Sequence, residues 1–422
     1  MGSIRDTPKG MAIDLKPLFS RRIQQWEPGA IRSLLPLESL AGMISLVAGK
    51  PDPETFPFAK ISISLKGSNE TTIVLKESLL REALQYGSPG GNAELIQWFK
   101  GLQKRVHGLP ESNDWACCVG NGSQELIYRA FQAFTDLGDP VLLETHKNSS
   151  RGVIGFLKAA GHRLVEVNSD ADGLDLSELQ RTLSDWSEQR RRPRVLYTVP
   201  TGSNPTGRPS TESRKVEMLA TLTIFINFEE VPSKRARRYL ALEQEINGET
   251  GRVIRFDSLS KIVSSGMRLG FLMRPLPAVQ KPSTSIHHPI PRPVPISTLG
   301  LSWIPQTLCE SCQHLPTKRD AFTAAAERHL KGKAIWDTPT AGMFIWLTLR
   351  LLPYTDSFDL LSTKGMENGI LAILGVAFIL PNVRKTCQLR ASYSLVTEVE
   401  MDEACQRIAP GALKSSYPRP EC

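Results

Sequence analysis

Residues 116–144, ACCVGNGSQELIYRAFQAFTDLGDPVLLE, decide the fold of this chain. The stretch opens with a short apolar run at 116–119, continues with helical spacing of apolar residues over 123–134, and ends in a second apolar run at 141–144. Short apolar runs predict buried strands. A helix between two of them predicts a parallel pair joined by a crossover helix.

The same alternation continues to about residue 256. The expected elements downstream are helices over 152–160 and 174–186 and strands over 164–167, 194–199, 223–228 and 253–256. Upstream, helical spacing covers 77–84 and 92–106. Strands that are apolar on both faces are typical of parallel sheets covered by helices. We therefore predict an α/β fold whose large domain holds a mostly parallel sheet.

A second, smaller α/β domain is expected near the C-terminus. Its predicted elements are helices over 318–330 and 398–408 and strands over 341–347 and 388–393. Seven prolines between Pro275 and Pro295 exclude a long helix there and indicate a linker. The expected division is an N-terminal arm with part of the small domain at 1–50, a large domain at 51–285 and the small domain at 286–422.

Composition and charge narrow the class of protein. The chain has 422 residues, 41% of them apolar, with 51 Lys and Arg against 43 Asp and Glu, so its formal net charge is +8. These values exclude a disordered chain, a small disulfide scaffold and a coiled coil. The longest apolar stretch, 370–381, is too short to span a membrane. The basic runs at 190–192 and 234–238 are not interleaved with aromatic residues, so nucleic acid is not an expected partner.

Cysteine usage favours a reducing compartment. Seven cysteines are scattered along the chain, and an odd number argues against a disulfide framework. Cys309 and Cys312 have the spacing of half a zinc site, but no second pair follows them. We therefore prefer the interpretation that the two cysteines are incidental, and we expect no metal. The N-terminus carries no apolar signal core. We expect a cytoplasmic protein.

The densest chemical signal is the run from Ser258 to Lys261, with Arg268 close behind it, directly after the strand at 253–256. A lysine in an otherwise apolar stretch suggests a buried amine, whose pKa is lowered and which can form a Schiff base. Two hydroxyls and a guanidinium beside it suit a phosphate dianion. The alternative is a surface lysine in a serine-rich turn.

With these motifs the chain resembles the pyridoxal-phosphate aminotransferases of fold type I, class I/II, and among them the fungal aromatic and aminoadipate branch, which includes tryptophan and indolepyruvate enzymes. The resemblance runs over nearly the whole chain and also rests on GKPDPETFP at 49–57, YG at 86–87, GGN at 90–92, GNGSQ at 120–124, PTGSNPTG at 200–207, AGMFIW at 341–346 and LRASYS at 389–394.

The resemblance implies a role for each of twelve residues. Lys261 would bond to the cofactor as a Schiff base and move the proton at the substrate Cα. The cofactor would also be held by Gly122, Ser123, Gln124, Ser258, Ser260 and Arg268 around its phosphate, Asn204 at its ring hydroxyl, Glu230 at its ring nitrogen, and Tyr86 reaching the partner subunit's cofactor in a homodimer. Arg390 and Gly49 would bind substrate. Taken alone, the turns at 120–122 and 204–207 are common ones, and Arg390 also fits a structural salt bridge.

Three stretches depart from the family pattern. Glu230 stands where an aspartate is usual, and the tyrosine that follows it in the family is missing. His146 replaces a tyrosine expected over the cofactor ring, and prolines occupy 275–305 where relatives have a long helix. A mis-joined gene model or a decaying copy would explain all three.

The leading hypothesis is an aminotransferase that moves the amino group of tryptophan, phenylalanine or tyrosine to a 2-oxo acid by a ping-pong reaction, in a secondary pathway that uses an arylpyruvate such as indolepyruvate. The alternatives are a pyridoxal-phosphate-dependent C–S or β-lyase on the same scaffold and an inactive copy.

Overall fold

A computed structural model of the chain describes residues 14–25, 42, 49–66, 72–75, 77–88, 90–108, 115–145, 151–188, 191–204, 206–219, 224–229, 237, 239–247, 251–275, 314–350, 357, 365, 367–378 and 386–409. The chain divides into two compact units. The first is Met1–Asp136 with Glu243–Thr307, and the second is Leu137–Leu242 with Leu308–Cys422. The three-part domain division stays a prediction.

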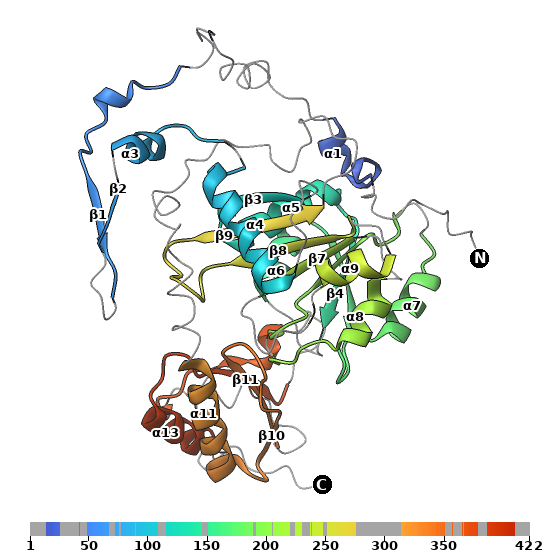
Figure 1. Cartoon of the computed structure of the whole chain (residues 1–422). Coiled ribbons are helices and arrows are strands. Elements are labelled where there is room, and N and C mark those ends of the chain that lie inside the picture. Colours follow the sequence, from blue (N-terminus) through green and yellow to red (C-terminus); the bar gives the residue numbers. More distant parts are fainter. Residues whose placement is uncertain are drawn as a thin grey trace. The chain divides into compact units, whose positions relative to one another are not determined.

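The largest sheet has seven strands in the order β3-β9-β8-β7-β6-β4-β5 (Figure 1). Its strands are β3 (Trp115–Asn121), β4 (Pro140–Thr145), β5 (Arg163–Asn168), β6 (Val195–Thr198), β7 (Ile224–Glu229), β8 (Val253–Ser258) and β9 (Leu269–Pro275). In the second unit β7, β6, β4 and β5 are parallel neighbours. In the first unit β9 is antiparallel to both β3 and β8. The predicted α/β fold is confirmed.

The first unit is built around β3, β8 and β9. Helix α5 (Ser123–Phe134) packs on all three strands, and α4 (Ala93–His107) packs on β3. Phe99 of α4 stacks on Phe271 of β9 with ring centroids 4.0 Å apart. The remaining described elements of this unit are η1 (Lys16–Leu18), α1 (Arg21–Gln24), η3 (Pro53–Thr55), β1 (Ile61–Ser64), β2 (Thr72–Leu75) and α3 (Glu77–Leu84).

The N-terminal arm docks on α5. Ser20 is buried, its backbone N–H donates to Ala133 O at 2.6 Å, and its hydroxyl donates to Gln132 O at 2.9 Å. The backbone N–H of Arg21 donates to Asp136 at 3.0 Å. These bonds hold the start of α1 against the last turn of α5.

Strands β4 and β6, at the centre of the parallel part of the second unit, are buried. Val141, Leu142, Val195 and Leu196 have no exposed surface, as expected for strands covered on both faces. The helices of this part are α6 (Arg151–Ala159), α7 (Leu176–Ser184), α8 (Glu212–Leu219) and α9 (Tyr239–Asn247), of which the last crosses into the first unit.

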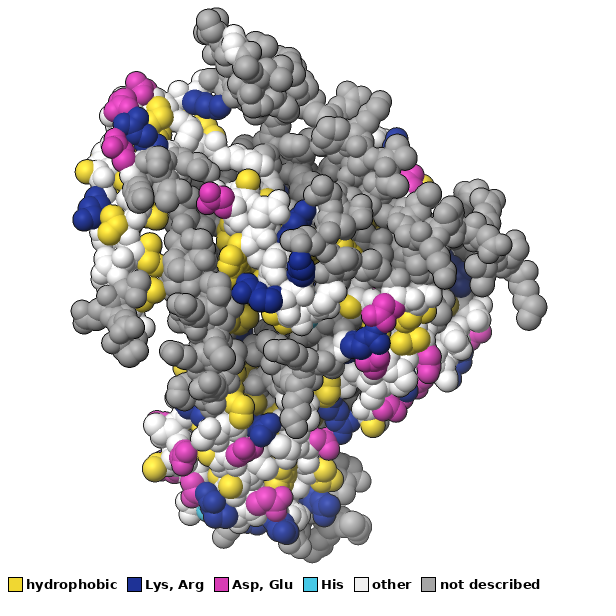
Figure 2. Space-filling model, in the orientation of Figure 1, with side chains coloured by type: hydrophobic (Ala, Val, Ile, Leu, Met, Phe, Trp, Pro, Cys, Tyr) yellow, Lys and Arg dark blue, Asp and Glu magenta, His cyan; other side chains and the backbone are white. Residues whose placement is uncertain are grey.

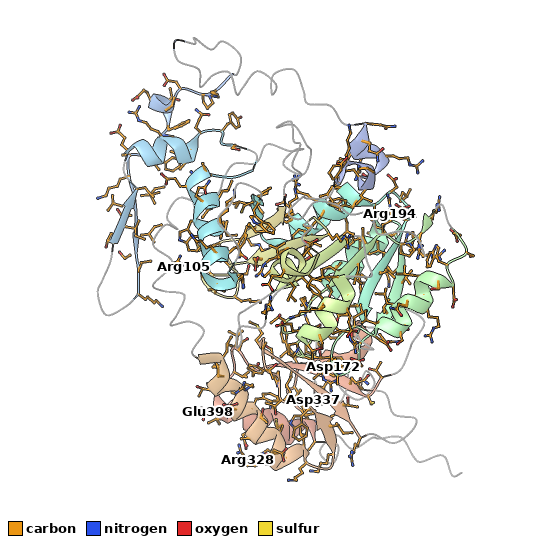
Figure 3. The ribbon with its side chains drawn as sticks, turned by 45° about the vertical axis from the view of Figure 1, so that its right-hand side comes forward. Arg105, Asp172, Arg194, Arg328, Asp337 and Glu398 are labelled. Atoms are coloured by element: carbon orange, nitrogen blue, oxygen red, sulfur yellow. The ribbon has the colours of Figure 1, made fainter. Side chains whose placement is uncertain are left out.

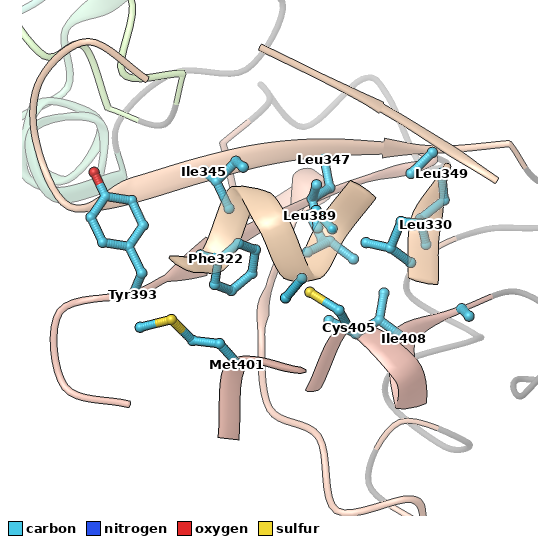
Figure 4. Close-up of a cluster of buried hydrophobic side chains, with 14 of the residues drawn as sticks. Phe322, Leu330, Ile345, Leu347, Leu349, Leu389, Tyr393, Met401, Cys405 and Ile408 are labelled. Carbon is cyan, nitrogen blue, oxygen red and sulfur yellow. The ribbon is translucent and has the colours of Figure 1, made fainter. Parts of the chain in front are cut away.

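A second sheet, in the order β10-β11-β13-β12, holds the C-terminal part of the second unit. Its elements are α11 (His314–Leu330), β10 (Ala334–Trp336), β11 (Phe344–Leu349), β12 (Ile373–Leu374), η8 (Gly375–Phe378), β13 (Gln388–Ser392) and α13 (Glu398–Ile408). Figure 4 shows side chains of α11 and α13 meeting one face of this sheet. The core there includes Phe322, Leu347, Leu389 and Met401, each at most 2% exposed.

Alternation along β11 separates the two faces of this sheet. Ile345, Leu347 and Leu349 are buried in the core, while Phe344 and Trp346 are half-buried on the opposite face. Successive side chains of a strand point to opposite faces. The core therefore uses one face and leaves an aromatic face on the other.

The surface around α11 and α13 is of mixed charge. Figure 2 shows acidic and basic side chains interspersed there. Arg328 of α11, labelled in Figure 3, donates through Nε to Asp402 of α13 at 2.9 Å and so links the two helices. Among the described residues, no helix combines the length and apolar character needed to cross a bilayer.

Most elements agree with the sequence prediction, and the differences have local causes. The helices predicted over 77–84, 123–134 and 398–408 have the observed bounds. Helix α7 starts later than predicted because the Asp175 side chain caps it, accepting from Ser177 N and Glu178 N. Strand β11 starts later because Gly342 takes a positive φ of 83°. The expectation missed β9, an apolar strand that follows the lysine motif, and the short strands β1, β2, β10 and β12.

Glu243 of α9 is a buried carboxylate. The backbone N–H of Arg252 donates to its Oε1 at 2.7 Å. Burial nevertheless raises the pKa of this carboxyl to about 7 from its ordinary 4.5. The fold therefore stabilises the protonated form.

We expect stability to fall as pH rises from about 4.5 to about 7, because the folded carboxyl binds more protons than the unfolded one in that window. The loss should be on the order of 3 kcal/mol. Glu243→Gln, neutral at every pH, should remove this slope. Midpoints of thermal unfolding at pH 5, 6, 7 and 8 would measure it, and parallel curves for the two proteins would contradict the prediction.

Candidate active site

Three strand ends meet at one edge of the sheet in the first unit. Strand β3 ends opposite the start of β9, with Asn121 paired to Leu269. Strand β8 ends beside the same point, with Ser258 paired to Gly270. The residues that follow β3 and β8 and the residue that precedes β9 are therefore neighbours. Antiparallel β9 thus brings together residues distant in sequence.

Gly122 joins β3 to α5 at this edge. Its φ is 77°, in the left-handed region that glycine adopts without a side-chain penalty. It is the N-cap of α5, and no side chain caps the helix there. A Cβ at this position would lie 2.5 Å from Nη2 of Arg268 and 3.2 Å from its Cζ. The guanidinium therefore lies against the backbone where α5 begins.

Arg268 is held in an unusual backbone conformation. Its φ of 51° makes it the one described non-glycine residue in the left-handed region. Such conformations cost free energy and occur often at functional sites. Its Nη1 donates to Ser265 O at 3.3 Å. The turn from Ser265 to Arg268 thus directs the guanidinium to the start of α5.

Ser258, Ser260 and Lys261 follow the end of β8. Ser258 is 8% exposed, and its hydroxyl oxygen accepts from the backbone N–H of Ser260 at 3.1 Å. Lys261 is exposed, so the expectation of a buried amine is wrong. The apolar Leu259 takes the buried position in this turn, at 2% exposed. The lysine amine is therefore accessible.

These residues fit a phosphate ester. The first turn of α5 has backbone N–H groups without a side-chain cap, and the guanidinium of Arg268 lies against its N-cap. Ser123, 8% exposed, begins the helix, and Gln124 follows it exposed. Helix N-termini favour anions through their free N–H groups and dipole. A Cβ on Gly122 would fill part of this cradle.

Asn204 and Arg390 are brought together within the second unit. Asn204 lies in the turn after β6, and Arg390 lies in β13. Nη1 of Arg390 donates to Oδ1 of Asn204 at 2.7 Å. This bond links residues 186 positions apart in the chain. Arg390 is thus anchored, and its forked donors suit a carboxylate.

Sequence reasoning missed the aromatic side chains around Arg390. Its Cζ lies 3.9 Å from the ring centroid of Phe344 and 5.1 Å from that of Phe378. Phe344 belongs to a motif that the sequence analysis quoted without giving the ring a role. Phe378 lies in the apolar stretch at 370–381, which gave no chemical signal.

A second missed feature lies just before Ser258. Arg255, 2% exposed, forms a bidentate ion pair with Asp257, with Nε and Nη2 at 2.6 and 2.7 Å from the two carboxylate oxygens. Nη2 also lies 3.0 Å from Nε2 of His107 in α4. The opposite charges of Arg255 and Asp257 on this short strand did not indicate the cluster in the sequence. The cluster links the end of β8 to α4.

The remaining predicted site residues either have no printed contact with the residues above or lie outside the described part of the chain. Tyr86 and Gly49 belong to the first unit, and the Tyr86 side chain is 66% exposed. Glu230, His146, Cys309 and Cys312 lie outside the described residues. In the described part of the chain, no cluster of three or more His, Cys, Asp or Glu side chains suits a metal ion.

Comparisons with known proteins point to one enzyme family. The family model for aminotransferase class I and II matches residues 64–408. The chain is 53% identical to aminotransferase tdiD of Emericella nidulans, over 97% of this chain and 98% of that protein. It is 27% identical to an aromatic amino acid aminotransferase of Schizosaccharomyces pombe, over 93% and 95% of the two chains.

Solved structures support the same fold. The crystal structure of aminotransferase Aro8 from Candida albicans superposes with a TM-score of 0.79 at 22% identity. The match covers 96% of this chain and 99% of that one.

We expect Gly122→Ala to weaken binding of a phosphate ester, such as pyridoxal phosphate, at least about tenfold. The added Cβ forces a strained φ and displaces the guanidinium of Arg268. Gly101→Ala in α4 is the control, since nothing lies within 4 Å of a Cβ there. Absorbance titration of each protein with pyridoxal phosphate would give the dissociation constants. Equal constants for wild type and Gly122→Ala would contradict the prediction.

Proposed function

The chain belongs to the class I and II aminotransferase family, and on that premise we propose that it moves the amino group of tryptophan, phenylalanine or tyrosine to a 2-oxo acid by a ping-pong reaction. It is a pyridoxal-phosphate-dependent aminotransferase with an α/β fold. The donor, the order of steps and the pathway are proposals.

The observation that carries the proposal is the convergence of Ser258, Lys261, Arg268 and the start of α5 at one sheet edge. A phosphate held by Arg268 and the α5 N–H groups would keep the cofactor beside an accessible amine. When bound, pyridoxal phosphate supplies an aldehyde and a ring that withdraws electrons from the substrate Cα.

We assign Lys261 two tasks. Its Nζ would hold the cofactor at its carbonyl carbon in the resting enzyme, and during the reaction it would carry the proton at the substrate Cα. Exposure of this side chain suits both tasks, because the amine must leave one bond and reach another atom. Glu230 is proposed as the acid at the ring nitrogen.

Arg390 is proposed to bind the substrate α-carboxylate. Its hydrogen bond to Asn204 fixes one edge of the guanidinium, so the side chain is already oriented before substrate binds. Asn204 is proposed to bond the ring hydroxyl as well, and Gly49 to contact the substrate.

An aromatic donor is supported by two observations. A relative over nearly the whole chain is named an aromatic amino acid aminotransferase. Phe344 and Trp346 present half-buried rings on the same sheet face as Arg390, and aromatic faces favour planar apolar side chains. We also propose a cytoplasmic homodimer in which Tyr86 reaches the partner subunit's cofactor, acting in secondary metabolism on an arylpyruvate such as indolepyruvate.

The test is a single-turnover experiment on the purified protein loaded with pyridoxal phosphate. Tryptophan, phenylalanine and tyrosine should each convert the cofactor's absorbance band to that of its amine form, with one arylpyruvate released per site. Addition of a 2-oxo acid should restore the band. Borohydride before substrate should fix the cofactor to Lys261, located by peptide mass.

Lys261→Ala should lose borohydride fixation and slow the amine transfer by at least about 10²- to 10⁴-fold, since it removes the group that moves the proton. Lys158→Ala, an exposed lysine of α6, is the control and should behave as wild type. Release of pyruvate and ammonia from a suitable amino acid would indicate a lyase instead. A cofactor that washes off the wild-type chain would indicate an inactive copy.

A further inference from the structure

The backbone of Arg390 is fixed on both sides. Strand β13 lies between β11 and β12, so Arg390 pairs with Trp346 on one side and Ile373 on the other. Its neighbour Leu389 is fully buried in the core that faces α11 and α13. Arg390 therefore lies on the aromatic face of the sheet.

Two rings flank the guanidinium. The Cζ distances of 3.9 Å to Phe344 and 5.1 Å to Phe378 are within the range of cation–π contacts. Phe378 is 3% exposed, and Trp346 meets its ring edge-on, with centroids 5.5 Å apart and planes at 89°. Phe378 is therefore a buried ring that Trp346 holds in place beside the guanidinium, and not an exposed surface ring.

Local structure places Phe378 there. It ends η8, which begins at Gly375 directly after β12. A Cβ on Gly375 would lie 2.6 Å from Thr386 Oγ1 and 2.9 Å from Gln388 O, so only glycine lets η8 approach the start of β13 this closely. The approach brings the ring, three residues later, over Arg390.

We propose that Phe378 is a positioning residue for the carboxylate-binding arginine, acting with Phe344. The rings contact the guanidinium group, while Asn204 accepts from Nη1. Stacking uses the face of a guanidinium and does not compete with the N–H donors on its edge, which bind carboxylates. This proposal rests on the proposed function of Arg390.

Removal of the Phe378 ring should produce a specific kinetic pattern. The amino acid and the 2-oxo acid both carry a carboxylate, so loss of the ring should lower kcat/KM for both by a similar factor. The rise should be in KM, with kcat nearly unchanged, because the proton transfer at Cα does not involve Phe378.

The binding test uses the cofactor-loaded enzyme, with 3-phenylpropanoate as the carboxylate probe and 3-phenylpropanamide as its neutral match. Phe378→Leu should weaken the carboxylate about 3- to 30-fold and leave the amide within about twofold. Phe322→Leu is the control, because Phe322 is equally buried in the same unit but contacts Tyr393. In an Arg390→Gln background, Phe378→Leu should have no further effect on the carboxylate.

A second measurement needs neither ligand nor turnover. Phenylglyoxal modifies arginine, and the rate at Arg390, followed by peptide mass, should rise in Phe378→Leu and stay unchanged in Phe322→Leu. This rate responds to Phe378 even if no aromatic donor reacts with the wild type, which separates failure of the proposed function from failure of this inference. An unchanged rate, or equal weakening of the carboxylate and the amide, would overturn it.

Discussion

The antiparallel strand β9, hydrogen-bonded between β3 and β8, is the constraint on which the proposed phosphate cradle of the first unit depends. Its register sets Leu269 opposite Asn121 and Gly270 opposite Ser258. That register carries Arg268 to the start of α5, where Gly122 leaves room for the guanidinium. A shift by one residue would reverse the faces of the strand and remove Arg268 from the cradle. The positive φ of Arg268 costs free energy locally, and the hydrogen bonds of the paired strands offset this cost.

Elements and contacts could be predicted from the sequence where their pattern lies within a few consecutive residues. Helices α3, α5 and α13 followed from apolar spacing alone, because their amphipathic faces repeat within a few residues. Strand β9 was missed because Arg268, directly before it, was assigned to the lysine motif, although Ser265-Gly266 is a turn signal between that motif and the strand. The residue types around Lys261 indicated phosphate chemistry, but the contact between Arg268 and Gly122 depends on a pairing that no local pattern encodes. Burial of Lys261 was expected wrongly because its apolar neighbours, above all Leu259, take the interior positions.

One strand alternation supports both the core of the C-terminal sheet and the position of Arg390. Leu347 and Leu389 fill the core shared with α11 and α13, while Trp346 and Arg390 occupy the same sheet level on the other face. Any change that loosens the core also loosens the arginine, since both are set by the same backbone hydrogen bonds. Arg390 lies within a motif that the sequence shows directly. Phe378 was missed because its contact with Arg390 depends on how closely η8 approaches β13.

Two arginines of the chain show how one side chain serves different ends. Arg255 directs two nitrogens to the carboxylate of Asp257, which consumes donors on its edge and ties β8 to α4. Arg390 meets the rings of Phe344 and Phe378, a contact that consumes no N–H donor. Contact with an aromatic ring uses none of the N–H donors on the edge of a guanidinium, and in Arg390 the donor Nη1 bonds Asn204. Partial burial strengthens the attraction of a guanidinium for an anion, because the effective dielectric constant falls as water is excluded. Aromatic neighbours therefore orient a binding arginine at a smaller cost to its charge than a carboxylate partner would.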